Sequence, residues 1–456
     1  MLRLFSIFIF GVTLLFGRHL DFTLIKKGDP NSTNVLLVVG GIQGDEPGGF
    51  MAASLLSTHY KIEKGAVWIV PNFNFYSIIK RNRGPFGDLN RKFAKLKTND
   101  PDFDLITRMK SIIKNKNIKM VVNLHDGSGF YRTKYIDKLH QPLKWGQSSI
   151  IDQDNIKGVK YGNLKKISDE IVAHVNKNLI KKEHEFRTKN TKTHIKRTFE
   201  EKEMSKTLTF YAINHGKAAF GNESSKSLPV HERVYYKLLS LEKFMDIMGI
   251  KYKRKFPLKP LVVKDIIDND IFISFNDKKI FIPLSGIRKK INYFPLEKGA
   301  KFTFKPSSPV MTVLQKNGKY TVYYGNRKLT TLVPEYLKYD ETDNSIKVNI
   351  DGKIRDVRFG TLVSVKNYFN VRPDSRYRVN VIGYVNKKHK NEVGLNIRKK
   401  QIIRRYSIDK YGKRYRVEVY DAKFKKKFLG MFLIEFNPKK KKAYSIVALN
   451  NFLKSK

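Results

Sequence analysis

The strongest constraint on the fold is an apolar segment, residues 35–39, that runs directly into the glycine-rich stretch 40–49. An apolar run bounded by glycines is typical of a buried strand that ends in a turn. A second apolar run, residues 120–124, ends at a histidine. Open α/β sheets place their sites at the carboxyl ends of strands. The candidate ligands of a metal ion at this edge are Gln43, Glu46 and His125.

Strand-like and helical patterns alternate from residue 34 to about residue 250, which predicts an α/β fold with a mixed open sheet flanked by helices. The predicted strands are 35–39, 67–70, 120–124 and 218–220, and the predicted helices are 49–60, 102–113, 164–180 and 231–248. The last helix meets Gly249, a plausible stop, so we expect the α/β domain to cover residues 18–252.

Two small all-β domains are predicted after it, at 253–338 and 339–456, because the chain changes to short runs of β-branched and aromatic residues. A charged segment at 334–344 marks the boundary between them. The second would form a sandwich, with an immunoglobulin-like fold as one form of it. The predicted strands are 261–263, 271–275, 279–282, 301–304, 320–324, 345–350, 353–358, 377–384, 415–420 and 431–436.

The amino-terminal residues 1–17 resemble a secretory signal peptide, with one basic residue followed by an apolar run that stops at Gly17. A membrane span needs ~20 apolar residues, so a retained anchor is the weaker interpretation. The chain contains no cysteine, so any metal must be held by nitrogen and oxygen ligands.

The formal net charge is +49, from 90 basic and 41 acidic residues. Export argues against nucleic acid as a partner, and an anionic extracytoplasmic polymer or membrane surface fits both facts better. A lineage preference for lysine would give the same charge without any partner, and the sequence does not separate the two explanations.

Gln43 and Glu46 are three residues apart, so a turn that leads into a helix can direct both side chains at one ion. A zinc enzyme that hydrolyses amides needs about three protein ligands and one open position, at which bound water reaches a pKa of ~7. A basic loop could bind a carboxylate and stabilise an oxyanion through its guanidinium groups, although it could also be an ordinary surface loop. Its candidate residues are Arg81, Arg83, Asn90 and Arg91.

Together these residues resemble the zinc carboxypeptidase (carboxypeptidase A-like) superfamily. The similarity is carried by Glu46, the 88–91 tetrapeptide, a strand that ends in His125, and a late strand that leads to Glu223. The chain departs from that pattern at Gln43, where the superfamily has a histidine. The Gln-x-x-Glu pair, a signal peptide and two β domains look like a narrower group, the cell-shape-determining peptidoglycan DL-carboxypeptidases of helical Gram-negative bacteria.

The resemblance implies a periplasmic enzyme that holds one zinc ion and trims peptidoglycan stem tripeptides to dipeptides with release of meso-diaminopimelate. Its β domains would contact the cell wall or other envelope proteins. The implied metal ligands are Gln43, Glu46 and His125. The implied binders of the substrate's terminal carboxylate are Asn90 and Arg91, Arg81 or Arg83 would polarise the scissile carbonyl, Glu223 would be the general base and acid, and Tyr211 would cap the substrate.

Two alternatives remain at the level of sequence. Because an amide oxygen is a weaker zinc ligand than imidazole, Gln43 is also compatible with a catalytically inactive muropeptide-binding or scaffold protein derived from a peptidase. The same fold could also serve an amidinohydrolase-like enzyme or a deacylase that acts on small acyl amino acids.

Overall fold

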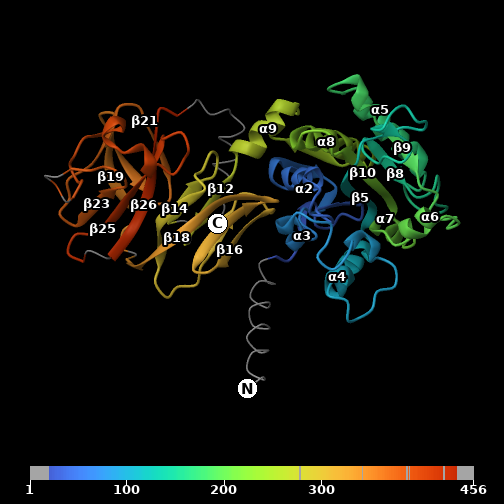
Figure 1. The fold of residues 1–456 in the computed structure, drawn as a ribbon, viewed down its shortest axis with the longest axis horizontal. Coiled ribbons are helices and arrows are strands. Elements are labelled where there is room, and N and C mark those ends of the chain that lie inside the picture. The colour runs from blue at the N-terminus through green and yellow to red at the C-terminus, as the bar shows by residue number, and fades with distance from the viewer. Residues whose placement is uncertain are drawn as a thin grey trace, which may run out of the picture. The chain divides into compact units, whose positions relative to one another are not determined.

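The computed structural model describes residues 20–276, 279–340, 342–386, 389, 391–424 and 427–438. The predicted signal peptide therefore lies outside the described residues. The described chain forms two compact units (Figure 1). One extends to residue 267 and includes 325–327, and the other contains 268–324 and the residues from 328 onward. No described helix is long and apolar enough to cross a membrane.

The first unit is built on a mixed sheet of seven strands, as the sequence predicts. In spatial order the strands are β1 (Ile25–Gly28), β4 (Ala66–Val70), β2 (Val35–Gly40), β5 (Ile118–Gly127), β10 (Ala218–Ser225), β8 (Ser148–Ile151) and β9 (Arg187–Asn190). The central strands β4, β2, β5 and β10 are parallel, whereas β1 and β8 run antiparallel to their neighbours β4 and β10. Apolar runs such as β2 are buried on both faces, which is the pattern of a parallel sheet covered on both sides.

Helices cover both faces of this sheet (Figure 1). One layer contains α2 (Pro47–His59), α8 (Val230–Ile247) and α5 (Leu164–Asn176), and the other contains α4 (Phe103–Lys114) and α7 (Leu208–Ile213). A β-carbon at Gly49 would lie 2.5 Å from the carbonyl oxygen of Leu124, so α2 can approach β5 only with glycine at this position. The shorter elements of the unit are β3 (Tyr60–Lys64), α3 (Phe75–Lys80), β6 (Phe130–Tyr131), β7 (His140–Gln141), α6 (Phe199–Met204) and β11 (Lys251–Arg254).

The predicted strand at 261–263 is wrong, because these residues lie in the helix α9 (Pro260–Asn269). Proline occupies the first position of this helix, where its missing N–H is no loss. Val263, Ile266 and Ile267 are spaced three and four apart, so the helix buries all three on one side. The predicted strand at 301–304 is also largely wrong, since β15 covers only Phe304–Pro306.

The second unit is all β apart from short 3-10 turns among its described residues. A small sheet contains β13 (Ile280–Pro283), β12 (Phe272–Phe275) and β15. A larger sheet has the order β16 (Met311–Lys316), β17 (Lys319–Tyr324), β18 (Arg327–Tyr339), β26 (Lys427–Phe436), β25 (Arg414–Asp421) and β23 (Tyr377–Val381), with β14 (Lys290–Glu297) on β18 and β21 (Leu362–Val365) on β26. A third contains β20 (Lys353–Arg358), β19 (Ser345–Ile350), β22 (Tyr368–Val371) and β24 (Ile397–Arg398).

One strand joins the two predicted β domains. β18 extends into the predicted boundary segment 334–344, ends there at Tyr339, and pairs in parallel with β26, with Lys338 opposite Lys427 and Tyr339 opposite Phe428. The two β regions therefore share a sheet at this point. Hairpins turn at Asn317 between β16 and β17 and at Asp351 between β19 and β20, and both residues have positive φ angles.

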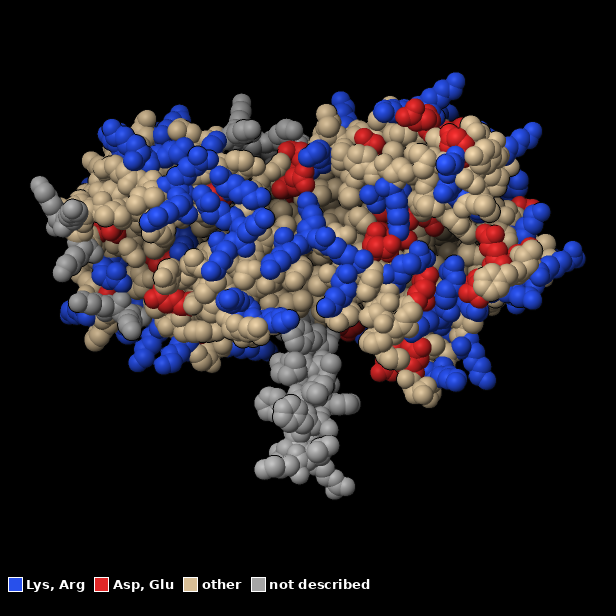
Figure 2. Space-filling model, in the orientation of Figure 1, with Lys and Arg blue, Asp and Glu red and all other residues tan. Residues whose placement is uncertain are grey.

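Basic side chains are spread over the face shown in Figure 2, with carboxylates scattered among them. On this face the charge is not restricted to one of the two units.

Candidate active site

The turn between β2 and α2 holds Gln43 and Glu46, and Glu46 is the N-cap residue directly before α2. His125 lies near the carboxyl end of β5, and Glu223 lies directly opposite it on the parallel neighbour β10. The strand order therefore brings the turn, the histidine and the second glutamate to the same edge of the sheet.

Two of the predicted ligands are in direct contact. The Nδ1 atom of His125 lies 2.9 Å from Oε2 of Glu46, and both side chains are buried. The backbone N–H of Asp126 donates a second hydrogen bond to the same oxygen, at 3.1 Å. Although burial opposes a charge on the imidazole, the carboxylates of Glu46 and Glu223 raise the pKa of His125.

The third predicted ligand, Gln43, is 2% exposed and is held by a carboxylate. Its Nε2 atom donates to both oxygens of Asp88, at 2.8 and 2.9 Å. Because the nitrogen end of the amide is engaged, Oε1 is the end left for another ligand. Burial opposes ionisation of Asp88, but the hydrogen bond from Gln43 and the charge of Arg83 lower the pKa of its carboxyl group.

Asn123 contacts the other nitrogen of the imidazole. Its Nδ2 atom lies 2.7 Å from Nε2 of His125, while its Oδ1 atom is buried and has no hydrogen-bond partner among the described residues. The two ends of an amide are assigned from the hydrogen bonds they can make, not observed directly. Rotating this amide would let Oδ1 accept the Nε2 proton, which would leave the Nδ1 lone pair free for a metal ion.

These residues fit a divalent metal ion. The described residues contain no cluster of three His, Cys, Asp or Glu side chains that could hold a metal, so Glu46 and His125 need the amide oxygen of Gln43 as a third donor. Imidazole nitrogen and carboxylate oxygen are ordinary zinc ligands. A carboxylate behind a ligand, as Asp88 lies behind Gln43, is a common feature of such sites.

Glu223 has the properties of a proton carrier. The pKa of its carboxyl group is raised to about 7. Burial is the largest cause, Glu46 and Asp126 add to the rise, and His125 and Lys237 oppose it. Its Oε2 atom is buried and has no hydrogen-bond partner among the described residues. A carboxyl group that titrates near neutrality can both accept and return a proton.

The structure distinguishes the two candidate arginines. Arg83 Nη2 lies 3.0 Å from Oδ2 of Asp88, the carboxylate that holds Gln43. Arg81 ends α3 with a φ of 58°, and its Nε donates to the carbonyl of Asn326 at 2.5 Å. Arg83 is therefore the arginine that is joined to the predicted ligands.

Asn90 and Arg91 lie in a 3-10 turn, η1 (Leu89–Arg91), that begins at Asp88. The Nδ2 atom of Asn90 lies 3.4 Å from Nε2 of His125, and its Oδ1 accepts a hydrogen bond from the backbone N–H of Leu208. Arg91 donates to the carbonyl of Asn90 at 3.2 Å. Asn90 is thus beside the predicted metal ligands, and Arg91 follows it.

Tyr211 lies on α7, not on a strand. Its ring packs against His215 at a centroid distance of 4.1 Å and against Phe93 at 6.0 Å. Among the described residues, no hydrogen bond or ring contact joins it to the predicted metal ligands or to Glu223. Its role toward a substrate stays a prediction.

Several residues around the site were not found from the sequence. Asn123 could have been found, because it lies two positions before His125 in a strand and so shares its face. Lys226 lies three residues after Glu223, and its Nζ is 2.6 Å from Oδ2 of Asp45 and 3.7 Å from Oε1 of Glu46. Lys237 is a lysine within the buried stripe of α8, which is itself an unusual signal.

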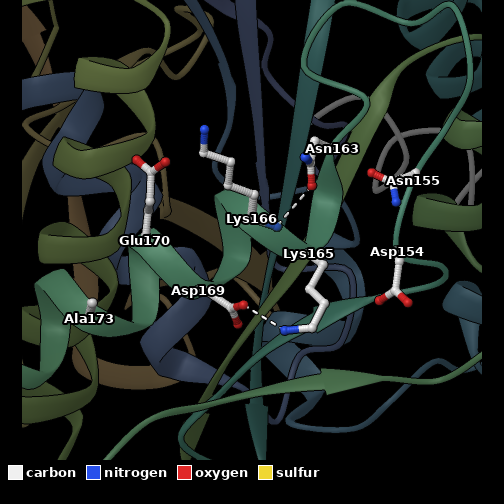
Figure 3. A pocket seen from close by; sticks show the side chains of 8 residues that line it. All are labelled: Asp154, Asn155, Asn163, Lys165, Lys166, Asp169, Glu170 and Ala173. Carbon is white, nitrogen blue, oxygen red and sulfur yellow. Dashed lines mark hydrogen bonds and ion pairs between the residues drawn. The ribbon is translucent and has the colours of Figure 1, made fainter.

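A polar depression of about 610 Å³ elsewhere in the first unit contains none of the predicted site residues (Figure 3). Several of its polar groups already have partners. Nζ of Lys165 lies 2.6 Å from Oδ2 of Asp169, and the side chain of Asn163 caps α5 by accepting a hydrogen bond from the backbone N–H of Lys166. The lining residues are Asp154, Asn155, Asn163, Lys165, Lys166, Asp169, Glu170 and Ala173. These pairings give no reason to place chemistry there.

Comparison with known families matches almost the whole described chain. Residues 7–268 match the catalytic domain of the carboxypeptidases controlling helical cell shape. Residues 268–338 match the β-barrel domain of the same carboxypeptidases, and residues 339–437 match a C-terminal domain of metallo-carboxypeptidases. The chain belongs to this family of cell-shape carboxypeptidases. It is therefore a metallocarboxypeptidase by family, with the α/β fold and the β-rich domains that the sequence predicts.

Solved structures of one family member are similar along their full length. The apo crystal structure of the cell shape determinant protein Csd4 from Helicobacter pylori is 37% identical to this chain, with a TM-score of 0.79 over 91% of this chain and 100% of Csd4. The tripeptide-bound form of Csd4 gives a TM-score of 0.78 over the same shares, again at 37% identity. The mDAP-bound form, described as a D,L-carboxypeptidase, gives 0.79 at 37% identity over 90% of this chain and 100% of Csd4. No match was found among curated protein sequences.

Proposed function

We propose that this carboxypeptidase is an exported, zinc-dependent DL-carboxypeptidase that trims peptidoglycan stem tripeptides to dipeptides, releases meso-diaminopimelate and so contributes to cell shape. The observation that carries the proposal is the contact between Glu46 and His125 directly beside Glu223. The full-length similarity to Csd4, which has been solved with a tripeptide and with mDAP, supports the choice of substrate.

In this proposal one zinc ion is held by Gln43, Glu46 and His125. When bound, the ion supplies polarisation of the scissile carbonyl and acidification of the attacking water. Asp88 keeps the amide of Gln43 in the orientation that presents its oxygen. The buried surroundings of the pair exclude bulk water, which strengthens these electrostatic interactions.

The remaining residues bind the substrate and move protons. Asn90 and Arg91 bind its terminal carboxylate, and Arg83 stabilises charge on the carbonyl oxygen. Glu223 takes a proton from the attacking water on its carboxylate and returns it to the leaving amine. The buried, unpartnered Oε2 atom of Glu223 is available for that transfer.

The proposal places the enzyme in the periplasm after removal of residues 1–17. The β domains at 253–338 and 339–456 then position the α/β domain, 18–252, on the cell wall or on other envelope proteins. Amino-terminal sequencing of the protein recovered from a periplasmic fraction tests the export step. Recovery of the intact amino terminus in the cytoplasm would contradict it.

The test of the reaction is chromatography with mass analysis of muropeptides incubated with purified protein. Wild-type protein should convert tripeptides to dipeptides, and Glu223→Gln should lower the rate by roughly 10²–10⁴-fold, because general acid–base catalysis contributes about that factor. Glu63→Gln, on the surface strand β3, is the matched control and should cleave normally.

Cleavage by Glu223→Gln at the wild-type rate would overturn the assignment of the base. Wild-type protein that binds muropeptides without zinc and leaves them intact would instead favour the non-catalytic scaffold. The arrangement of Gln43 argues against that alternative, because a carboxylate orients its amide as a ligand requires.

A further inference from the structure

We propose that Lys237 of α8 is a positioning residue of the active site. Together with Asp126 it holds the three elements that carry Glu46, His125 and Glu223 in fixed relation. The inference deepens the proposed function and rests on it, since it concerns the support behind the same catalytic residues.

Lys237 joins the two strands of the site. Its side chain is completely buried, and its Nζ donates to the carbonyl oxygen of His125 and, at 3.3 Å, to that of Asn222. Asn222 directly precedes Glu223 on β10, and β10 is the parallel neighbour of β5. One ammonium group therefore binds both strands at the level of the histidine and the glutamate.

Asp126 extends this support to the third element. Its Oδ1 lies 3.3 Å from Nζ of Lys237, and its Oδ2 accepts a hydrogen bond from the backbone N–H of Gly48 at 2.7 Å. Gly48 lies in the first turn of α2, whose N-cap residue is Glu46. A β-carbon at Gly48 would lie 2.3 Å from Oδ1 of Asp126, so this approach requires glycine. The helix that carries Glu46 is thereby fixed to the ion pair behind His125.

Arg233 completes the group from the same helix as Lys237. Its Nη1 lies 2.9 Å from Oδ2 of Asp126, and its Nε donates to the carbonyl of Leu228. Asp126 therefore forms ion pairs with two cations and accepts a hydrogen bond from one backbone N–H. The cluster contains Asp126, Arg233 and Lys237.

The complete burial of Lys237 argues that its ammonium group has a specific role and is not there by chance. Taking a charged group out of water is costly, and a buried ion pair is often no more stabilising than apolar side chains of similar volume. Lys237 lies among the buried residues Val234, Leu238 and Leu241, where methionine or leucine would fit the apolar stripe of α8. An apolar residue could not donate the hydrogen bonds that Lys237 makes to the carbonyl oxygens of His125 on β5 and Asn222 on β10.

A simpler explanation must be separated from this one, namely that Lys237 only neutralises Asp126. The two explanations predict different behaviour when both charges are removed. We therefore compare Lys237→Met, which keeps the length of the side chain, with the double variant Lys237→Met/Asp126→Asn. Lys243→Met on the same helix is the control, since Lys243 forms only a partly exposed pair with Glu170.

Four quantities are measured for each protein: kcat and KM for a muramyl tripeptide, zinc affinity by competition with a chelator, and the midpoint of thermal unfolding. Lys237→Met should lower kcat by roughly 10- to 100-fold and weaken zinc binding, as losses of outer-shell support do. Its KM should change little, because no contact with substrate is removed. In the double variant kcat and zinc affinity should stay low, because the hydrogen bonds from Nζ to the carbonyl oxygens of His125 and Asn222 are still missing.

Recovery of kcat in the double variant would overturn the inference, because neutralisation of Asp126 would then explain the whole effect. Wild-type kcat and zinc affinity in Lys237→Met would also overturn it. Failure of the proposed function looks different: the wild-type protein would then neither bind zinc nor cleave the tripeptide, and the control would behave in the same way.

Discussion

The amide of Gln43 differs from an imidazole ligand in having two ends of nearly equal shape, of which only the oxygen can bind a cation. An unsupported glutamine would also turn its NH₂ group toward the site in part of the population, and that group cannot bind a cation. Asp88 removes that alternative by accepting two hydrogen bonds from Nε2. If Gln43 is a ligand, as proposed, the neighbouring carboxylate of Asp88 corrects this weakness of an amide.

Asp88→Asn tests this role at the level of one residue. The substitution replaces one of the two acceptor oxygens by a donor and removes the charge that pairs with Arg83. We expect zinc affinity, measured by chelator competition, to fall by roughly 10-fold or more. Asp104→Asn, an exposed position in α4, is the control. Unchanged zinc affinity in Asp88→Asn would show that the amide of Gln43 needs no support.

The candidate ligands could be predicted from the sequence because they follow strands whose apolar runs are plain. The residues that support them could not, since their positions depend on which strands and helices become neighbours. Lys237 is distant in sequence from His125, and only the packing of α8 brings the two together. A carboxylate such as Asp126 looks like any turn residue until its partners are known.

At the level of elements, the four central strands β4, β2, β5 and β10 agree with the sequence pattern because buried parallel strands are continuous apolar runs, whereas the outer strands β1, β8 and β9 were not predicted. The failure at 261–263 has the same cause, since three apolar residues after a proline suit a strand and a helix equally well. The helix α9 is indicated by the spacing of Ile266 and Ile267, which follow Val263 by three and four residues. The pairing of β18 with β26 had no signal in the sequence, because it joins residues far apart in the chain.

A buried carboxyl group beside strand β23 gives the second unit a pH-dependent stability. Glu392 accepts a hydrogen bond from the backbone N–H of Val381 at 2.9 Å, and burial raises the pKa of its carboxyl group from 4.5 to about 7. Above pH 7 the folded state must bury a charge that the unfolded state exposes to water. Below pH 4.5 both states are protonated and this destabilisation disappears.

Glu392→Gln should therefore raise the thermal unfolding midpoint of the second unit at about pH 8 by a few degrees, and should leave it unchanged near pH 4. The amide oxygen can still accept from Val381, so the hydrogen bond is kept. Calorimetry at both pH values measures the difference. Asp356→Asn, at an exposed position of β20, controls for the loss of a negative charge alone. An equal shift at both pH values would contradict the explanation.

At the level of the whole molecule, the net charge of +49 has two possible meanings, a functional attraction to anionic envelope polymers or a bias in composition. The basic side chains are dispersed over the visible face and do not form one groove (Figure 2). A dispersed charge acts at long range and raises the rate of encounter with a polyanion more than it selects a particular sequence or structure.

The salt dependence of cell-wall binding distinguishes the two explanations of the net charge. The screening length falls from about 10 Å at 0.1 M salt to about 3 Å at 1 M. If the charge serves attachment, binding of the protein to isolated cell walls, measured by co-sedimentation, should weaken strongly over this range. Hydrolysis of a small soluble tripeptide should change much less, since the predicted metal ligands Gln43, Glu46 and His125 are buried. Cell-wall binding that is indifferent to salt would favour a bias in composition.

The end of strand β18 pairs with β26, which lies about ninety residues further along the chain. During synthesis, the edge at Lys338 and Tyr339 therefore emerges well before the residues that cover it. Unpaired edges of this kind are sites of premature association between chains. If the chain is exported unfolded, as proposed, it avoids this hazard for as long as it is kept extended, and a delay in translocation should then protect the second unit.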